Sequence, residues 1–341
     1  MHWKDLQTRD GRWAGLELAV DKGELPPKPK WRLEYAPPGR VRVVCGRHVQ
    51  LWARIDDWWE DWWVVQGERV PEGVLPPIRA DVLRQVRADP GSDGWWSAWA
   101  RRYAQWLRES VCSPLYPARW WLTPLLPGVT PKENNGSAGL PRSWYPMKTE
   151  GGAESFERLF THEAKPLRAM SPEDDPRVKA WRKRARDGSL PPLLLAASSS
   201  LGIFFLLDGH DRLSAAQLEQ KPVSAFSLQP VETVRHAPDL QRQEAVWRAF
   251  EEVLVDPERS KRIPTSTVNA TLLSAYETEH LHTRQRVWPL PQGRARWARE
   301  VRRRLAALGV DPDTSDILRP LTHLPSGRPK RRRPPAPSTS S

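Results

Sequence analysis

The apolar residues of this chain recur in two periods, and each period predicts a different element. Around a probable turn at residues 45–47 the apolar positions are spaced by two, which predicts β-strands; they are Val41, Val43, Val49 and Leu51. Between residues 95 and 107 the spacing becomes helical, and large side chains share one face; they are Trp95, Trp96, Trp99, Tyr103, Trp106 and Leu107.

The segment from residue 171 to residue 228 alternates between helix and strand signals. Asp175 followed by Pro176 predicts an N-cap and the first residue of a helix that ends at Gly188. Short apolar runs at residues 191–196 and 202–207 predict two strands, the second of them central because it is apolar on both faces. A helix over residues 210–219 and a strand over residues 222–228 complete the predicted unit.

Three more helices are predicted downstream, at residues 239–254, 267–276 and 294–308. The last of them carries a stripe of Trp297, Val301, Leu305 and Leu308 and stops before Gly309. Residues 325–341 contain Pro, Arg and Ser with no apolar period, so we expect this tail to be disordered.

A polar, Gly- and Asn-rich stretch at residues 128–153 is the best candidate for a domain boundary. The predicted plan is therefore a Trp-rich domain of mixed character at 1–127, a linker or long loop at 128–153, and an α/β domain at 154–235. A helical extension at 236–324, basic towards its end, and the tail at 325–341 follow. The predicted fold class is α/β or α+β.

The strand-to-helix turn at Asp208-Gly209-His210-Asp211-Arg212 is the segment most typical of a ligand site. Gly209 permits a tight turn and a close backbone approach. A helix start offers free N–H groups and a partial positive charge to an anion. Arg212 can add a planar fork of donors. We therefore expect Gly209, His210 and Arg212 to bind a phosphate-bearing ligand; an ordinary β–turn–α corner with an Asp–Arg pair is the alternative.

The run from Leu207 to Ala216, LDGHDRLSAA, resembles the DGHHR…AA signature of the ParB/sulfiredoxin-like family. The resemblance covers about residues 165–235 and implies a small α/β core that binds nucleotide or DNA phosphate, or that performs ATP-dependent phosphoryl chemistry. His210 stands where sulfiredoxin has its catalytic Cys, so sulfinic acid reduction is not expected.

Three functions follow from this resemblance and from the turn. The first is a DNA-associated binding module. The second is a nucleotide-dependent phosphotransferase or nucleotide hydrolase, in which Asp208 and Asp211 would be catalytic and the cofactor would be a nucleotide with Mg²⁺. The third is a protein-interaction scaffold whose site is vestigial. No metal site intrinsic to the chain is predicted.

The charge of the chain is concentrated at its end. The formal net charge is +12, and the segment from Leu281 onward holds fourteen Lys and Arg against four acids, which is +10 of that total. Such a charge asymmetry is typical of proteins that bind a polyanion, most often a nucleic acid. The expected contacts are Arg294, Arg296, Arg299, Arg302, Arg303 and Arg304, with Lys330, Arg331, Arg332 and Arg333 of the tail. A solvated face with a solubilising tail is one alternative, and a membrane-surface role is the other.

The 19 Trp and two Cys invite two further interpretations. Trp at helical or strand spacing usually packs in a core, and acidic neighbours at residues 56–61 disfavour base stacking by the first pairs. Cys45 and Cys112 do not make a disulfide framework, so we expect two reduced thiols in a cytoplasmic protein. No apolar run is long enough to predict a membrane span.

Overall fold

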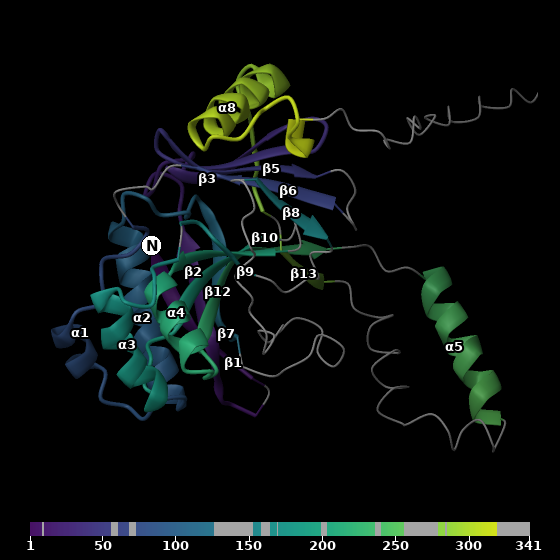
Figure 1. Cartoon of the computed structure of the whole chain (residues 1–341). Coiled ribbons are helices and arrows are strands. Elements are labelled where there is room, and N and C mark those ends of the chain that lie inside the picture. Colours follow the sequence, from purple (N-terminus) through teal and green to yellow (C-terminus); the bar gives the residue numbers. More distant parts are fainter. Residues whose placement is uncertain are drawn as a thin grey trace, which may run out of the picture.

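The structure is a computed structural model of the 341-residue chain (Figure 1). It describes every residue except 9, 56–60, 68–72, 126–152, 158–163, 169, 199–202, 236–239, 256–278, 284 and 319–341. The fold is α+β, within the predicted class. No helix in the described part of the chain has the length and apolarity needed to cross a membrane.

The larger of two sheets, called here the large sheet, combines strands from both halves of the chain. Among the described residues it has eight strands in the order β1-β2-β7-β12-β10-β11-β9, with β13 paired to β12. Their bounds are β1 His2–Gln7, β2 Trp13–Val20, β7 Ala118–Leu125, β9 Ala164–Pro166, β10 Leu193–Ser198, β11 Ile203–Asp208, β12 Ala225–Arg235 and β13 Glu279–Thr283.

The small sheet is mainly antiparallel and has the order β14-β3-β4-β5-β6-β8 in the described residues. Its strands are β3 Trp31–Ala36, β4 Arg40–Cys45, β5 His48–Ile55, β6 Asp61–Gln66, β8 Ala153–Glu157 and β14 Trp288–Pro289. The predicted strands around residues 45–47 are confirmed as β4 and β5, and the turn between them begins with Gly46 at φ +61°.

The described helices are α1 Ala80–Gln85, α2 Asp93–Glu109, α3 Pro176–Arg186, α4 His210–Leu218, α5 Leu240–Val255, α8 Gly293–Ala307 and a short 3-10 turn at Asp316–Leu318. Apart from α1 and the 3-10 turn, each lies where the sequence predicted a helix. Asp175 caps α3 by accepting from the Arg177 N–H, as expected. α5 extends away from the rest of the molecule in Figure 1. The helix predicted at 267–276 and the tail at 325–341 lie outside the described residues.

A single hydrophobic cluster joins the two sheets and α2. Trp31 of β3 meets Phe205 of β11 edge to face at 5.9 Å between ring centroids. The Trp pair of α2 is fully part of this core, since Trp95 and Trp96 are 4% and 5% exposed. Core packing is therefore confirmed for these side chains and for Trp120, whereas Trp58 and Trp59 lie outside the described residues.

The large sheet crosses the domain boundary that the sequence suggested at 128–153. β7 comes from the predicted N-terminal domain, and β12 from the predicted 154–235 domain. The two strands pair antiparallel from Ala225↔Leu125 to Val231↔Arg119. Because both segments hydrogen-bond in one sheet and share one core, the described residues do not separate there into independent layers. The physical reason is that β2 and β7 complete a sheet that the segment at 154–235 leaves open at β12.

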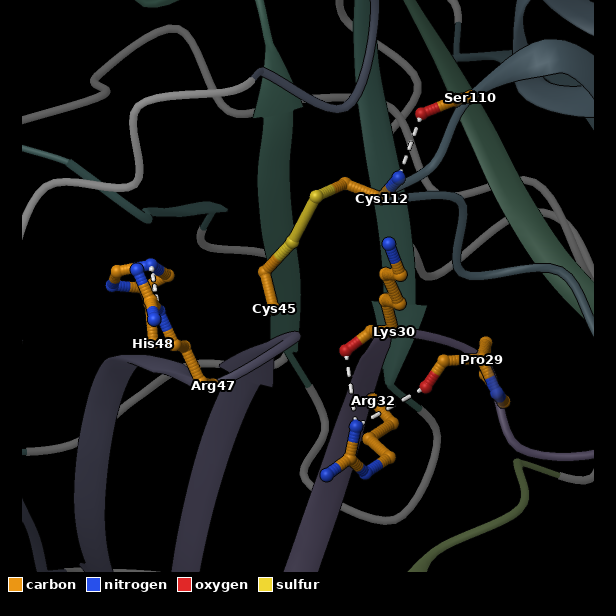
Figure 2. The surroundings of a disulfide bond; sticks show 8 residues. All are labelled: Pro29, Lys30, Arg32, Cys45, Arg47, His48, Ser110 and Cys112. Atoms are coloured by element: carbon orange, nitrogen blue, oxygen red, sulfur yellow. Dashed lines mark hydrogen bonds between the residues drawn. A yellow bond between two sulfur atoms is a disulfide. The ribbon is translucent and has the colours of Figure 1, made fainter.

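The expectation of two reduced thiols is wrong for this structure, because Cys45 and Cys112 form a disulfide (Figure 2). Cys45 ends β4 of the small sheet, and Cys112 lies in the connection between α2 and β7. Their Cα atoms are 6.0 Å apart, a normal spacing for a disulfide. Both residues are buried. The bond therefore ties the small sheet to an element that leads into the large sheet.

Candidate functional site

The predicted turn lies at the end of β11, where Asp208 closes the strand and α4 begins at His210. Gly209 has φ +103°, a backbone conformation that favours glycine. A Cβ at this position would lie 2.5 Å from Leu193 Cδ2 and 2.9 Å from Arg212 Nη2. A side chain here would therefore be strained and would also displace Arg212, so the turn requires glycine for two separate reasons.

Arg212 is buried and turned into the protein. Its Nη2 donates to Asp208 Oδ2 at 2.6 Å, to the Pro192 carbonyl at 3.1 Å and to the Tyr103 hydroxyl at 3.5 Å. The guanidinium carbon also lies 5.8 Å from the ring centroid of Trp181 in α3. Arg212 therefore joins the strand end, α2 and α3; its pair with Asp208 is the one that the alternative interpretation of the turn expected, whereas its contacts with Tyr103 and Trp181 were not indicated by the sequence.

Asp211 is also held by neighbours. It accepts from Arg168 Nη2 and from Ser171 Oγ, both at 2.7 Å. Burial acts to raise the pKa of Asp211, but these two hydrogen bonds and the charge of Arg168 outweigh it, so its pKa lies below the ordinary value. Asp211 is therefore a charged acceptor at neutral pH and is poorly suited to hold a proton.

His210 is the least satisfied residue of the turn. Its side chain is buried, and Nε2 has no hydrogen-bond partner. Burial lowers the pKa of His210 to about 3, and the nearby positive charge of Arg168 adds to the effect. His210 is therefore neutral at pH 7. Arg212 Nε, two residues away in sequence, is likewise buried without a partner.

The structure thus brings together all five predicted residues of the turn and adds four partners that sequence reasoning missed. The added residues are Tyr103, Arg168, Ser171 and Trp181. No motif marked them, because Tyr103 comes from a distant helix and Arg168 and Ser171 lie in an irregular segment.

The second predicted region, the basic helix α8, covers the outer face of the small sheet (Figure 1). Its apolar stripe of Trp297, Val301 and Leu305 is buried there. Trp297 Nε1 donates to the Val41 carbonyl at 2.9 Å. Arg304 donates to the carbonyls of Gln66 and Gly67 at 2.9 and 3.0 Å. Arg304 therefore fixes the helix to the sheet.

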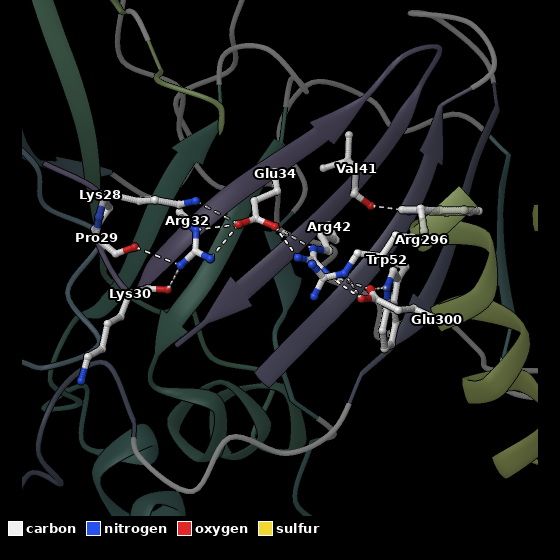
Figure 3. Close-up of polar contacts among 11 residues, drawn as sticks. Lys28, Pro29, Lys30, Arg32, Glu34, Val41, Arg42, Trp52, Arg296 and Glu300 are labelled. Carbon is white, nitrogen blue, oxygen red and sulfur yellow. Dashed lines mark hydrogen bonds and ion pairs between the residues drawn. The ribbon is translucent and has the colours of Figure 1, made fainter. Parts of the chain in front are cut away.

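Beneath α8 a chain of alternating charges runs across the sheet (Figure 3). Glu34 pairs with Arg32 and Arg42, and Arg42 Nη1 reaches both oxygens of Glu300 at 2.7 Å. Glu300 also accepts from Trp52 Nε1 at 3.0 Å and from Arg296 Nε at 2.8 Å. Burial acts to raise the pKa of Glu300, but these hydrogen bonds bring it below the ordinary value.

The six arginines predicted to contact nucleic acid therefore divide into two groups. Arg304 bonds to the small sheet, and Arg296 pairs within α8 with Glu300, the residue that Arg42 of the sheet contacts. Arg294, Arg299, Arg302 and Arg303 are exposed. Lys330 and the three arginines after it lie outside the described residues.

The element order predicted for residues 171–228 is confirmed, since α3, β10, β11, α4 and β12 follow one another as expected. The family resemblance itself stays a prediction that rests on the LDGHDRLSAA motif. Comparison with protein-family models, with curated proteins and with solved structures found no match to this chain.

Proposed function

We propose that the chain binds a phosphate-bearing ligand, a nucleotide or a DNA backbone, at the turn from Gly209 to Arg212, and that it is DNA-associated. One observation carries the proposal. His210 Nε2 and Arg212 Nε are two of the six buried side-chain atoms without a hydrogen-bond partner among the described residues. Both belong to one helix start. Buried polar groups are normally paired, so unpaired ones often indicate a missing ligand or water.

The backbone at the start of α4 adds donors to the same place. The first helical hydrogen bond there joins the Leu213 N–H to the Gly209 carbonyl at 2.8 Å, and the N–H groups before it have no acceptor within the helix. A helix start carries a partial positive charge. Because His210 is neutral, it can donate one hydrogen bond to an anion from Nε2 without adding charge.

The two carboxylates favour binding over catalysis. Asp208 is paired with Arg212, and Asp211 with Arg168, so neither carboxylate stands alone beside the proposed ligand. A general base needs a pKa near the working pH, and the pKa of Asp211 is shifted in the opposite direction. The phosphotransferase or hydrolase function, with a nucleotide and Mg²⁺, stays the alternative and predicts phosphate release in the same titrations.

Exposed arginines on α8 support the nucleic-acid part of the proposal. Arg294, Arg302 and Arg303 have no ion-pair partner within the described part of the chain. Phosphate backbones are bound mainly through such clustered positive charges.

The test is a calorimetric titration of the full chain with inorganic phosphate, ATP, CTP and a short DNA duplex, each with and without Mg²⁺. His210→Ala should lower the affinity for the small phosphate ligands roughly three- to tenfold, because one hydrogen bond is lost. His210→Gln should restore part of the affinity because it keeps a donor. His2→Ala is the matched control, since its side chain is 74% exposed and belongs to another element. Equal affinities in His210→Ala and His2→Ala would remove the turn from the function.

A further inference from the structure

The helix α3 is the most basic element of the described chain, although the first 280 residues, which contain it, carry a formal net charge of only 12 − 10 = +2. Its eleven residues include six bases and no acid: Arg177, Lys179, Arg182, Lys183, Arg184 and Arg186. Acids flank the helix instead, with Asp175 as its N-cap and Asp187 as its C-cap. The two caps offset only two of the six charges, and acids elsewhere in the first 280 residues offset the rest in the total, so the helix itself stays strongly positive.

Two of the six bases fix α3 to its neighbour. Arg182 and Arg186 both pair with Glu219, which follows the last residue of α4. Val178 and Ala185 are buried on the same side of α3. The helix is therefore held firmly against α4, which begins at the proposed phosphate site.

The remaining four bases have no partner among the described residues: Arg177, Lys179, Lys183 and Arg184. Lys179 and Lys183 are exposed, and at 3.6 residues per turn they lie about 100° and 140° around the helix axis from the buried Val178, which places them towards the outward side. They are one turn apart, about 6 Å along the axis. This outward side, with Arg177 and Arg184 beside it, is called here the α3 basic face.

We propose that the α3 basic face binds the phosphate backbone of a nucleic acid. This inference rests on the nucleic-acid part of the proposed function and adds a second contact surface to it. Phosphate neutralisation needs clustered Lys and Arg and no particular sequence of bases. Four unpaired bases on one short, fixed helix supply that cluster.

Two observations favour a nucleic acid over an anionic membrane. A membrane-surface helix inserts an apolar face, but the apolar residues of α3 point into the protein or contact Arg212. The outward side offers only Lys, Arg and Ala180. The helix α3 packs beside the large sheet and α8 packs on the small sheet. A nucleic acid that contacts both helices must therefore extend along the protein surface from one to the other.

The experiment compares three double variants of the full chain, each with two charges removed. Lys179→Gln/Lys183→Gln tests the α3 basic face, and Arg302→Gln/Arg303→Gln tests α8. Lys22→Gln/Lys30→Gln is the control, because both lysines are exposed in the connection between β2 and β3 and have no ion-pair partner among the described residues. A fluorescent 20-base-pair duplex is titrated by anisotropy between low and physiological salt. Thermal melts verify that all three variants fold.

The α3 variant should flatten the slope of log affinity against log salt by up to about 1.8, since each duplex phosphate contact contributes about 0.9. The control should leave the slope unchanged. If α3 and control slopes agree while the α8 variant binds more weakly, the α3 proposal fails and the proposed function stands. If the wild-type chain binds no duplex, the α3 proposal and the nucleic-acid part of the proposed function both fail, whereas nucleotide binding at the turn is tested by its own titrations. Loss of binding to phosphatidylserine vesicles but not to duplex in the α3 variant would overturn the proposal in favour of a membrane.

Discussion

Removal of the Cys45–Cys112 disulfide should destabilise the protein strongly. The bond closes a loop between residues 67 positions apart. In the chain-entropy description, a loop of that length restricts the unfolded state by about 15 cal/mol/K, which is about 4.4 kcal/mol at 25 °C. Unfolding a chain of 341 residues has an entropy of about 0.7 kcal/mol/K near 60 °C. The predicted loss in Tm is therefore about 6 °C.

The assay is differential scanning calorimetry of the oxidised wild type, the reduced wild type and Cys45→Ala/Cys112→Ala. Thiol titration of the denatured, unreduced protein should find no free thiol, and reduction should release two. The reduced wild type should melt near the double variant, because both lack the cross-link. The double variant is its own control, since adding reductant should leave its Tm unchanged.

A wild-type Tm that does not respond to reduction would refute the entropic argument. Two free thiols in protein equilibrated with oxidised glutathione would refute the bond itself. The outcome also bears on the predicted cytoplasmic location, because disulfides persist mainly in oxidising compartments. A bond that forms only after purification would agree with a cytoplasmic protein.

Three further predictions concern the turn and the helix that covers the small sheet. Gly209→Ala should cost about 2–4 kcal/mol through left-handed strain and overpacking, whereas Gly46→Ala, where a Cβ meets nothing within 4 Å, should cost only the strain; urea unfolding measures both. Because His210 stays neutral when folded, with a pKa of about 3 against 6.5, the unfolded state gains the proton as pH falls below 6.5. The free energy of unfolding of the wild type should therefore fall by roughly 2 kcal/mol between pH 7 and pH 5. His210→Gln should remove this fall, and an equal fall in the variant would contradict the prediction. Glu300→Gln should cost about 2–3 kcal/mol at pH 7, and this difference should disappear as pH falls below about 4.3, since the folded pKa is depressed and protonation removes the charge; Glu244→Gln, at an exposed pair on α5, should cost little.

The local elements could be predicted because their signals are contained in neighbouring residues. The cap at Asp175, the stop at Gly188 and the apolar stripe of α8 each depend on spacings of one to four residues. The motif turn was found for the same reason, since Asp208 to Arg212 are contiguous. In this strand–turn–helix the positive φ that the backbone requires is indicated by the single glycine at position 209.

Contacts between distant segments could not be predicted in this way. Nothing near Arg212 indicates that Tyr103 would meet it, and nothing near Cys45 indicates Cys112. The pairing of β7 with β12 could likewise not be predicted, because each segment by itself reads as an ordinary strand and does not indicate its partner. The α3 basic face was missed for another reason, because a net charge summed over 280 residues hides a positive helix between acidic caps.

The closure of the small sheet by α8 has a consequence for how the chain is made. Arg42 meets Glu300 across 258 positions of sequence, and β14, which pairs with β3, also comes from the C-terminal part. On a ribosome the first strands emerge long before the helix that covers them. Chain segments normally fold from the N-terminus as they appear, but here the charged face of the small sheet must stay hydrated until α8, at residues 293–307, has been synthesised. A nascent chain stalled before residue 293 would therefore expose Trp52 and the arginines beside it, and the emergence of α8, rather than growth of the N-terminal half, would cover the small sheet.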